Sequence, residues 1–135
     1  MENELICLDT SILIDFYRKK VKEKSLFFHL TTKYSLFAVS IVTEYEIMIG
    51  TNKEQAEYWS GFFDRVTILP FDKAANDVAI EITKGLKSTN QLIEVPDIFI
   101  GATALSKNLK IATLNKKHFE KIPGLQIIDN LNQLS

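Results

Sequence analysis

Short apolar runs alternate with longer amphipathic segments along the chain. Five of the short runs predict β-strands, because strands covered on both faces of a sheet are apolar throughout. These strands are expected at 5–8, 36–39, 66–69, 110–114 and 125–128. The longer segments place apolar residues at helical spacing. These helices are expected at about 11–19, 23–32, 41–50, 53–64, 72–88 and 97–108. The alternation predicts an α/β domain built from βαβ units around a parallel sheet.

The segment 72–88 has the clearest helical pattern, and Asp72 is its expected N-cap. Residues 87–96, KSTNQLIEVP, predict a loop, because a polar cluster leads to Pro96, which can open the next helix. A length of 135 residues suits one ordinary domain, and the chain shows no internal repeat or linker. We therefore expect residues 1–135 to form a single domain.

Composition narrows the class of protein. The formal charge of −1 gives no overall basic field, so any contact with nucleic acid must be local. The single cysteine, Cys7, excludes an internal disulfide, and one cysteine with two histidines is too few for a zinc cluster. No apolar run approaches the ~20 residues of a membrane span, and the N-terminus is acidic. We expect a cytoplasmic protein that makes no contact with membranes.

Polar residues stand near the carboxyl ends of the predicted strands, where ligands bind in open α/β sheets. Asp9 follows the first strand, and Glu46 lies early in the helix after the second. Asp97 begins the helix at Pro96, and Asn115 follows the fourth strand. We expect all four side chains to project from the same edge of the sheet, although they are far apart in the sequence.

Clustered carboxylates predict a bound cation, because they repel one another and are costly to bury uncompensated. Mg²⁺ and Mn²⁺ fit such a cluster, since both prefer hard oxygen ligands. An ion held in this way activates water and stabilises the charge that develops on a phosphate during in-line displacement. The set therefore indicates hydrolysis of phosphodiester bonds.

Each of the four residues also has a simple structural explanation. Asp9 can cap the helix that follows it, and Glu46 completes a capping-box pattern that begins at Thr43. Asp97 suits the N-terminus of any helix, and Asn115 suits a turn after a strand. No single position is specific, and only the set indicates a site.

Four segments of the chain resemble the PIN-domain family, and most closely the VapC-type toxins of bacterial toxin–antitoxin pairs. They are LDTSILIDF (8–16), SIVTEYEIMIG (40–50), PDIFIGATAL (96–105) and IATLNKKHFEKIPGLQII (111–128). The segments occur in family order and at family spacing. The resemblance implies a three-layer α/β/α sandwich with a five-stranded parallel sheet. It also implies an endoribonuclease that depends on Mg²⁺ or Mn²⁺.

The resemblance further implies which residues bind the metal ion and act in catalysis. The acidic ligands of the family fall on Asp9, Glu46 and Asp97. The second ligand is Glu46 and not Glu44, because the family glutamate stands four residues before a glycine, here Gly50.

The fourth catalytic position of the family, often Asp, is Asn115 in this chain. An amide can orient water or bind a metal ion weakly, but it adds no charge. We therefore expect one firmly bound ion, with any second ion arriving with the phosphate. Thr10, Ser11 and Thr113 are expected to hydrogen-bond the carboxylates or metal-bound water, and a capping role remains open for each of them.

Two basic clusters are candidates for contact with the RNA backbone, although lysine runs are also common on solvated faces. The first is RKKVKEK, residues 18–24, and the second comprises Lys107, Lys110, Lys116, Lys117, His118 and Lys121. Arg18 and Lys116 are the expected substrate contacts. His118 is expected to pack or bond locally, because metal-bound water already supplies the nucleophile.

Aromatic residues widen the apolar band of the helix expected at 53–64, through the pairs Trp59–Phe63 and Tyr58–Phe62. Most of this band is expected to form core, and a small domain can leave part of it exposed for a partner. VapC-type toxins dimerise and are held inactive by an antitoxin segment in such a groove. The resemblance therefore implies a homodimer and an antitoxin partner.

A different class remains open: a PIN-like module that binds RNA or a protein without cutting, its chemistry weakened by Asn115. Metal binding and turnover would separate the two classes. A phosphatase of the haloacid-dehalogenase type needs a second acid two residues after Asp9, where this chain has Ser11. Neither G-x-x-x-x-G-K-[ST] nor G-x-G-x-x-G occurs, so the phosphate cradles of P-loop and Rossmann proteins are absent from the sequence.

Overall fold

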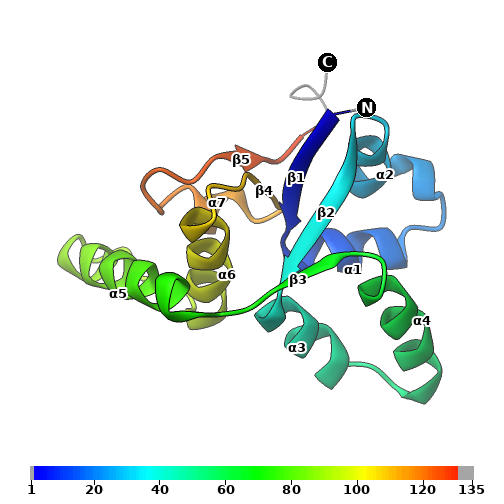
Figure 1. Cartoon of the computed structure of the whole chain (residues 1–135), viewed down its shortest axis with the longest axis horizontal. Helices are drawn as coiled ribbons and strands as arrows, with labels where there is room; N and C mark the ends of the chain where they lie inside the picture. Colours follow the sequence, from blue (N-terminus) through cyan, green and yellow to red (C-terminus); the bar gives the residue numbers. More distant parts are fainter. Residues whose placement is uncertain (1, 131–135) are drawn as a thin grey trace.

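A five-stranded, fully parallel sheet forms the middle layer of the computed structural model, which describes residues 2–130 (Figure 1). The strand order is β3-β2-β1-β4-β5, so the first strand of the chain is the central strand of the sheet. The strands are β1 (Glu2–Leu8), β2 (Tyr34–Ser40), β3 (Thr67–Leu69), β4 (Ile111–Ala112) and β5 (Ile127–Ile128).

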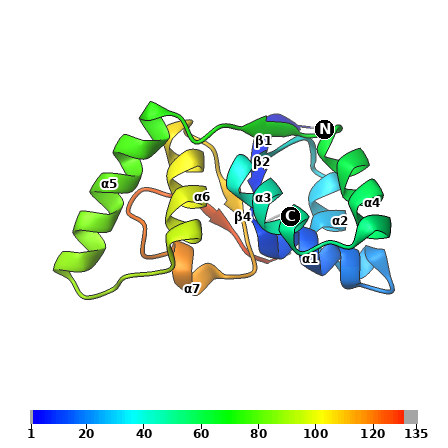
Figure 2. The same cartoon turned by 90° about the horizontal axis from the view of Figure 1, so that it is seen from below.

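Helices cover both faces of this sheet (Figures 1 and 2). One face carries α1 (Thr10–Arg18), α2 (Leu26–Thr31) and α4 (Lys53–Phe63). The other face carries α5 (Lys73–Ser88), α6 (Val95–Ser106) and α7 (Lys116–Phe119). The helix α3 (Ile41–Ile49) lies at the carboxyl edge, and its side chains enter both cores. The structure is therefore the α/β/α sandwich expected from the sequence.

The two cores follow from the alternation of side chains along β1. Ile6 and Leu8 are fully buried in the core with α1, α2 and α4, whereas Cys7 is fully buried in the core with α5 and α6. Burial, and to a smaller extent the neighbouring Asp9 carboxyl, raises the pKa of the Cys7 thiol to about 12. The thiol therefore packs as a small hydrophobe.

One predicted helix begins at a different residue in the structure, because a capping side chain fixes its start. The helix expected at 23–32 is interrupted at Ser25, whose hydroxyl accepts a hydrogen bond from the Phe28 backbone N–H and so starts α2. Only a short 3₁₀ helix, Lys22–Lys24, precedes it. The short helix α7 was not predicted at all. Asp72 caps α5 as predicted, since it accepts from the Ala75 backbone N–H at 2.9 Å.

Strand lengths also differ from the prediction. The central strand β1 begins earlier than expected, at Glu2, while β4 contains only Ile111 and Ala112. The predicted loop at 87–96 is shorter, because α5 continues to Ser88 and α6 begins at Val95.

None of the helices in residues 2–130 is both long enough and apolar enough to cross a membrane.

Candidate active site

Asp9 lies immediately after the central strand β1, and its side chain is only 1% exposed. It occupies the N-cap position of α1, but its carboxylate makes no capping hydrogen bond. Instead, the hydroxyls of Ser11 and Thr113 donate to Asp9 Oδ2 at 2.7 Å and 2.8 Å. The capping explanation of Asp9 is therefore wrong for its side chain.

Backbone N–H groups fix the orientation of the Ser11 and Thr113 hydroxyls. The Leu114 N–H donates to Ser11 Oγ at 3.0 Å, and the Asn115 N–H donates to Thr113 Oγ1 at 2.8 Å. A hydroxyl has one hydrogen, so each is left to donate that hydrogen to the Asp9 carboxylate. The segment after β4 thus holds one oxygen of Asp9 in place.

Glu46 projects toward the same edge of the sheet from the middle of α3. Its Oε1 accepts a hydrogen bond from Thr10 Oγ1 at 2.8 Å, and Thr10 Oγ1 also lies 3.0 Å from Thr43 Oγ1. The N-cap of α3 is Ser40, whose hydroxyl accepts from the Val42 N–H. The capping-box explanation of Glu46 is therefore wrong, because the helix begins one turn before that pattern.

Asp97 lies in the first turn of α6, where a carboxylate also suits the helix macrodipole. Its Oδ2 is 2.6 Å from the Nδ1 atom of His118 in α7. The partner of His118 is therefore one of the candidate catalytic carboxylates, on a different helix. This contact ties α6 to α7 at the sheet edge. The expectation that His118 is not a general base stays a prediction.

The carboxylates at this edge influence one another's pKa values. Burial raises the pKa of the Asp9 carboxyl, Asp97 raises it further, and the hydroxyl hydrogen bonds oppose this increase. Burial likewise raises the pKa of Glu46, where the bond from Thr10 opposes the charges of Asp97, Asp9 and Glu94. The carboxylates are therefore close enough to affect one another, and negative charge is concentrated there.

Glu94 is an acidic residue near the site that the sequence analysis missed. It is exposed at the N-cap position of α6, three residues before Asp97, and its charge raises the pKa of Glu46. The available signal was the pattern E-x-x-D across the start of a helix, with both acids one turn apart. Glu94 falls inside the loop predicted at 87–96, whereas in the structure α6 begins directly after it.

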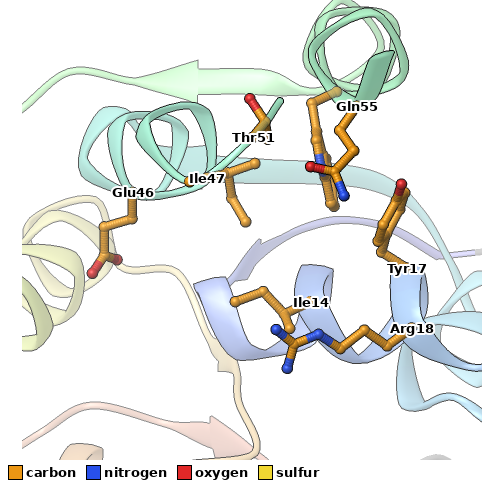
Figure 3. Close-up of a pocket in the computed structure, with 9 residues that line it drawn as sticks. Ile14, Tyr17, Arg18, Glu46, Ile47, Thr51 and Gln55 are labelled. Carbon is orange, nitrogen blue, oxygen red and sulfur yellow. The ribbon is translucent and has the colours of Figure 1, made fainter. Parts of the chain in front are cut away.

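The remaining sequence-predicted residues lie around the carboxylates. Asn115 is exposed at the N-cap position of α7 and does not cap it with its side chain. Lys116 is exposed in the first turn of α7. Arg18 ends α1 and lines a cavity that also contains Glu46 (Figure 3).

The donor set at this edge suits a hard divalent cation. Carboxylate oxygens come from Asp9, Glu46 and Asp97, and no thiol accompanies them, because Cys7 is buried in the core. Burial is the main cause of the raised pKa values of Asp9 and Glu46, and the charge of Asp97 adds to both increases. Across residues 2–130, no group of three or more His, Cys, Asp and Glu side chains is already arranged to hold a metal ion. A cation would therefore draw on carboxylates that approach from separate elements.

The fold and the site together define an α/β protein with an acidic, oxygen-rich site at the carboxyl edge of a parallel sheet. The family model of the PIN domain matches residues 6–125, and the chain therefore belongs to the PIN-domain family.

Known relatives match over nearly the whole chain. Ribonuclease VapC1 of Methanocaldococcus jannaschii is 32% identical, over 95% of this chain and 90% of the relative. Ribonuclease VapC of Rickettsia bellii is 30% identical, over 91% of this chain and 94% of the relative. Among solved structures, VapBC-1 from nontypeable Haemophilus influenzae has a TM-score of 0.80 and 26% identity, over 93% of this chain and 97% of that chain.

Proposed function

We propose that this chain is a single nuclease domain that hydrolyses RNA phosphodiester bonds in the cytoplasm, using a divalent metal ion. The observation that carries this proposal is the electrostatic interaction among the carboxylates of Asp9, Glu46 and Asp97. These side chains reach one sheet edge from three separate elements. RNA is the favoured substrate because relatives at 30% and 32% identity are named ribonucleases.

The metal ion, Mg²⁺ or Mn²⁺, would be held by Asp9, Glu46 and Asp97. When bound, such an ion activates a water molecule and stabilises negative charge on the phosphate. The protein orients these ligands with hydrogen bonds, from Ser11 and Thr113 to Asp9, from Thr10 to Glu46, and between His118 and Asp97. Asn115 completes the catalytic set as a neutral group for the substrate or a water molecule, and Lys116 binds an RNA phosphate.

The decisive experiment measures cleavage of total cellular RNA by purified protein in Mg²⁺, in Mn²⁺ and in EDTA. Asp9→Asn, Glu46→Gln and Asp97→Asn should each lower cleavage by about 100-fold or more, since each removes charge that acts on the transition state. Glu44→Gln is the matched control, because it changes an acid in the same helix α3 and should leave cleavage intact.

Cleavage that survives in EDTA, or in all three variants, would contradict the proposal. RNA binding without cleavage under any condition would favour a non-catalytic module instead. Asn115 is the residue that favours a non-catalytic module, because it supplies no charge at a position that is often Asp in the family. Gain of cleavage in Asn115→Asp would then identify the missing charge as the cause.

We also infer that this nuclease is the toxin of a toxin–antitoxin pair. The similar Haemophilus structure is of VapBC-1, and this chain carries an apolar cleft of about 510 Å³ between α1, α2 and α4 that suits an antitoxin segment. Aromatic rings of Phe16, Phe27 and Phe62 line the cleft. Expression of the wild type in bacteria should arrest growth, whereas expression of Asp97→Asn should not. Normal growth with the folded, active wild type would contradict the toxin assignment.

A further inference from the structure

A cavity of about 390 Å³ opens beside the carboxylates, between α1, α3 and α4 (Figure 3). Glu46 stands at one end of it and Arg18 at another, while Ile14 and Ile47 provide apolar walls. The volume falls within the range of small-ligand sites, and apolar walls with a few polar groups are typical of them. The cavity is therefore contiguous with the proposed catalytic edge through Glu46.

Arg18 contributes a positive charge to this cavity. Its guanidinium forms no ion pair or side-chain hydrogen bond with any other residue in the 2–130 range. Helical side chains lean toward the N-terminus of their helix, and the N-terminus of α1 adjoins Asp9. In Figure 3 the Arg18 side chain accordingly extends back along α1 as far as Ile14. A guanidinium there fits a phosphate next to the one being cut, since Arg binds phosphate oxygens through two parallel hydrogen bonds.

Gln55 presents hydrogen-bond donors to the same cavity. Its Oε1 accepts from the Asn52 backbone N–H at 3.0 Å, and its own backbone N–H donates to Asn52 Oδ1 at 2.9 Å, which forms the capping box of α4. A backbone N–H can only donate, so this bond fixes which end of the Gln55 amide is oxygen. The amide nitrogen then points toward the space beside Tyr17 (Figure 3).

We propose that this cavity holds one unpaired nucleotide of the RNA beside the scissile phosphate, with Arg18 on its phosphate and Gln55 donating to a carbonyl of its base. The inference rests on the proposed function, because RNA is the ligand. Tyr17 and Ile14 offer the aromatic and apolar surface on which unstacked bases pack. Uracil carries two carbonyls, cytosine and guanine one each, and adenine none, so a donor at Gln55 favours a carbonyl-bearing base such as uracil over adenine.

An RNA nucleotide suits this cavity better than a protein segment does. The cavity has polar groups at Arg18, Glu46 and Gln55, and it adjoins the carboxylates. An apolar helix from a partner would find more complementary surface in the neighbouring cleft of about 510 Å³, which is lined mainly by aromatic rings.

Binding of labelled RNA tetranucleotides in EDTA tests the base contact without turnover. The wild type should bind U₄ about 5- to 10-fold more tightly than A₄, as one hydrogen bond in a protein site would provide. Gln55→Glu keeps the oxygen that caps α4 but removes both N–H donors, so it should abolish this preference while the protein stays folded. Gln126→Glu is the matched control, because it adds the same charge at an exposed position before β5.

The phosphate contact is tested by Arg18→Gln in the same assay and in steady-state cleavage. Affinity for U₄ and A₄ should fall together by about 10-fold, and the salt slope of binding should decrease by about 0.7. In cleavage the loss should appear mainly in KM. Arg65→Gln, at the other arginine of the chain, is exposed near the 510 Å³ cleft and should change neither quantity.

The outcomes separate this inference from the proposed nuclease activity. A wild type that cuts RNA but binds U₄ and A₄ equally overturns the nucleotide site and leaves the nuclease intact. A wild type that discriminates U₄ from A₄ but never cuts supports the nucleotide site and overturns the nuclease. Unchanged RNA binding in both Gln55→Glu and Arg18→Gln overturns the inference and assigns the cavity to another ligand, such as a protein partner.

Discussion

At the scale of single residues, Asp9 works against the stability of the fold. Burial and the nearby Asp97 raise the pKa of its carboxyl above the ordinary value of 3.8. A carboxyl with a higher pKa in the folded state binds more protons there, so the free energy of unfolding falls as the pH rises through that interval. Above the raised pKa the ionised Asp9 lowers stability, which is a common cost of a functional site.

Replacing this charge should therefore stabilise the metal-free protein. Asp9→Asn should raise the Tm at pH 7 in EDTA by roughly 2–6 °C, and the difference should shrink toward pH 4, where the wild-type carboxyl becomes protonated. The amide oxygen of Asn can still accept hydrogen bonds from Ser11 and Thr113. Thermal melts across pH check this, with Asp77→Asn on the exposed face of α5 as control. A lower Tm for Asp9→Asn at pH 7 would refute the argument.

His118 should act as a positioning residue for Asp97, because its Nδ1 lies 2.6 Å from Asp97 Oδ2. Removing a hydrogen-bond partner of a metal ligand typically costs about 10- to 100-fold in metal affinity. His118→Leu should weaken Mn²⁺ binding by that factor in calorimetry, and His118→Asn should restore most of it, because an amide N–H can take the place of Nδ1–H. His29→Leu in α2 is the control. Equal Mn²⁺ affinity in His118→Leu would exclude the positioning role.

At the scale of elements, the helix α6 approaches α7 and the segment after it very closely. A Cβ atom added at Gly101 would lie 2.5 Å from Ile122 Cδ1 and 3.5 Å from Phe119 Cδ1. Both of these side chains are fully or almost fully buried, so they have little room to move. A glycine in the middle of α6 therefore serves packing, although it weakens the helix itself.

Two glycine substitutions should have opposite effects for this reason. Gly85→Ala in α5, with nothing within 4 Å of the new Cβ, should stabilise the protein by about 0.5–1 kcal/mol. Gly101→Ala should destabilise it by roughly 1 kcal/mol, because displacement of buried side chains outweighs the gain in helix propensity. Urea denaturation measures both changes. Equal stabilisation in the two variants would show that Ile122 adapts at no cost.

The elements that the sequence predicted well are those whose pattern repeats. The segment 72–88 contains enough turns for helical periodicity to be unambiguous, whereas the single turn of α7 has no periodicity to detect. Asp9 directly follows β1, so its position followed from the rule that the carboxyl ends of parallel strands share an edge. Asp97 begins a helix that follows α5 and not a strand, so this rule alone does not place it. The bond from His118 was not predictable, because it depends on how two helices dock and not on local pattern.

At the scale of the whole molecule, α3 and α6 present an unpartnered apolar face. Tyr45 and Ile49 are 64% and 67% exposed, and Val95 across the groove is 56% exposed. The groove between them has a volume of about 550 Å³ and lies beside Glu46. Exposed apolar patches of this kind mark interaction sites, and a second copy of this chain would cover the groove in the homodimer that the sequence resemblance implies.

A charge in this face should therefore prevent self-association. Ile49→Asp should elute as a monomer in size-exclusion chromatography with light scattering, at concentrations where the wild type is a dimer. Ile80→Asp is the matched control, since Ile80 is 43% exposed on α5, away from this groove. A monomeric wild type, or a dimer that tolerates Ile49→Asp, would rule out this interface.

The buried thiol of Cys7 makes the central strand accessible to kinetic measurement. It is the only cysteine of the chain, lies two residues before Asp9, and has a pKa of about 12 through burial. A thiol reagent can modify it only when β1 separates from its neighbours, so the labelling rate reports how often the sheet opens. A cation bound at Asp9 would slow that rate by stabilising the closed state. Cation binding at Asp9 can therefore be followed without RNA and without introducing a cysteine by mutation.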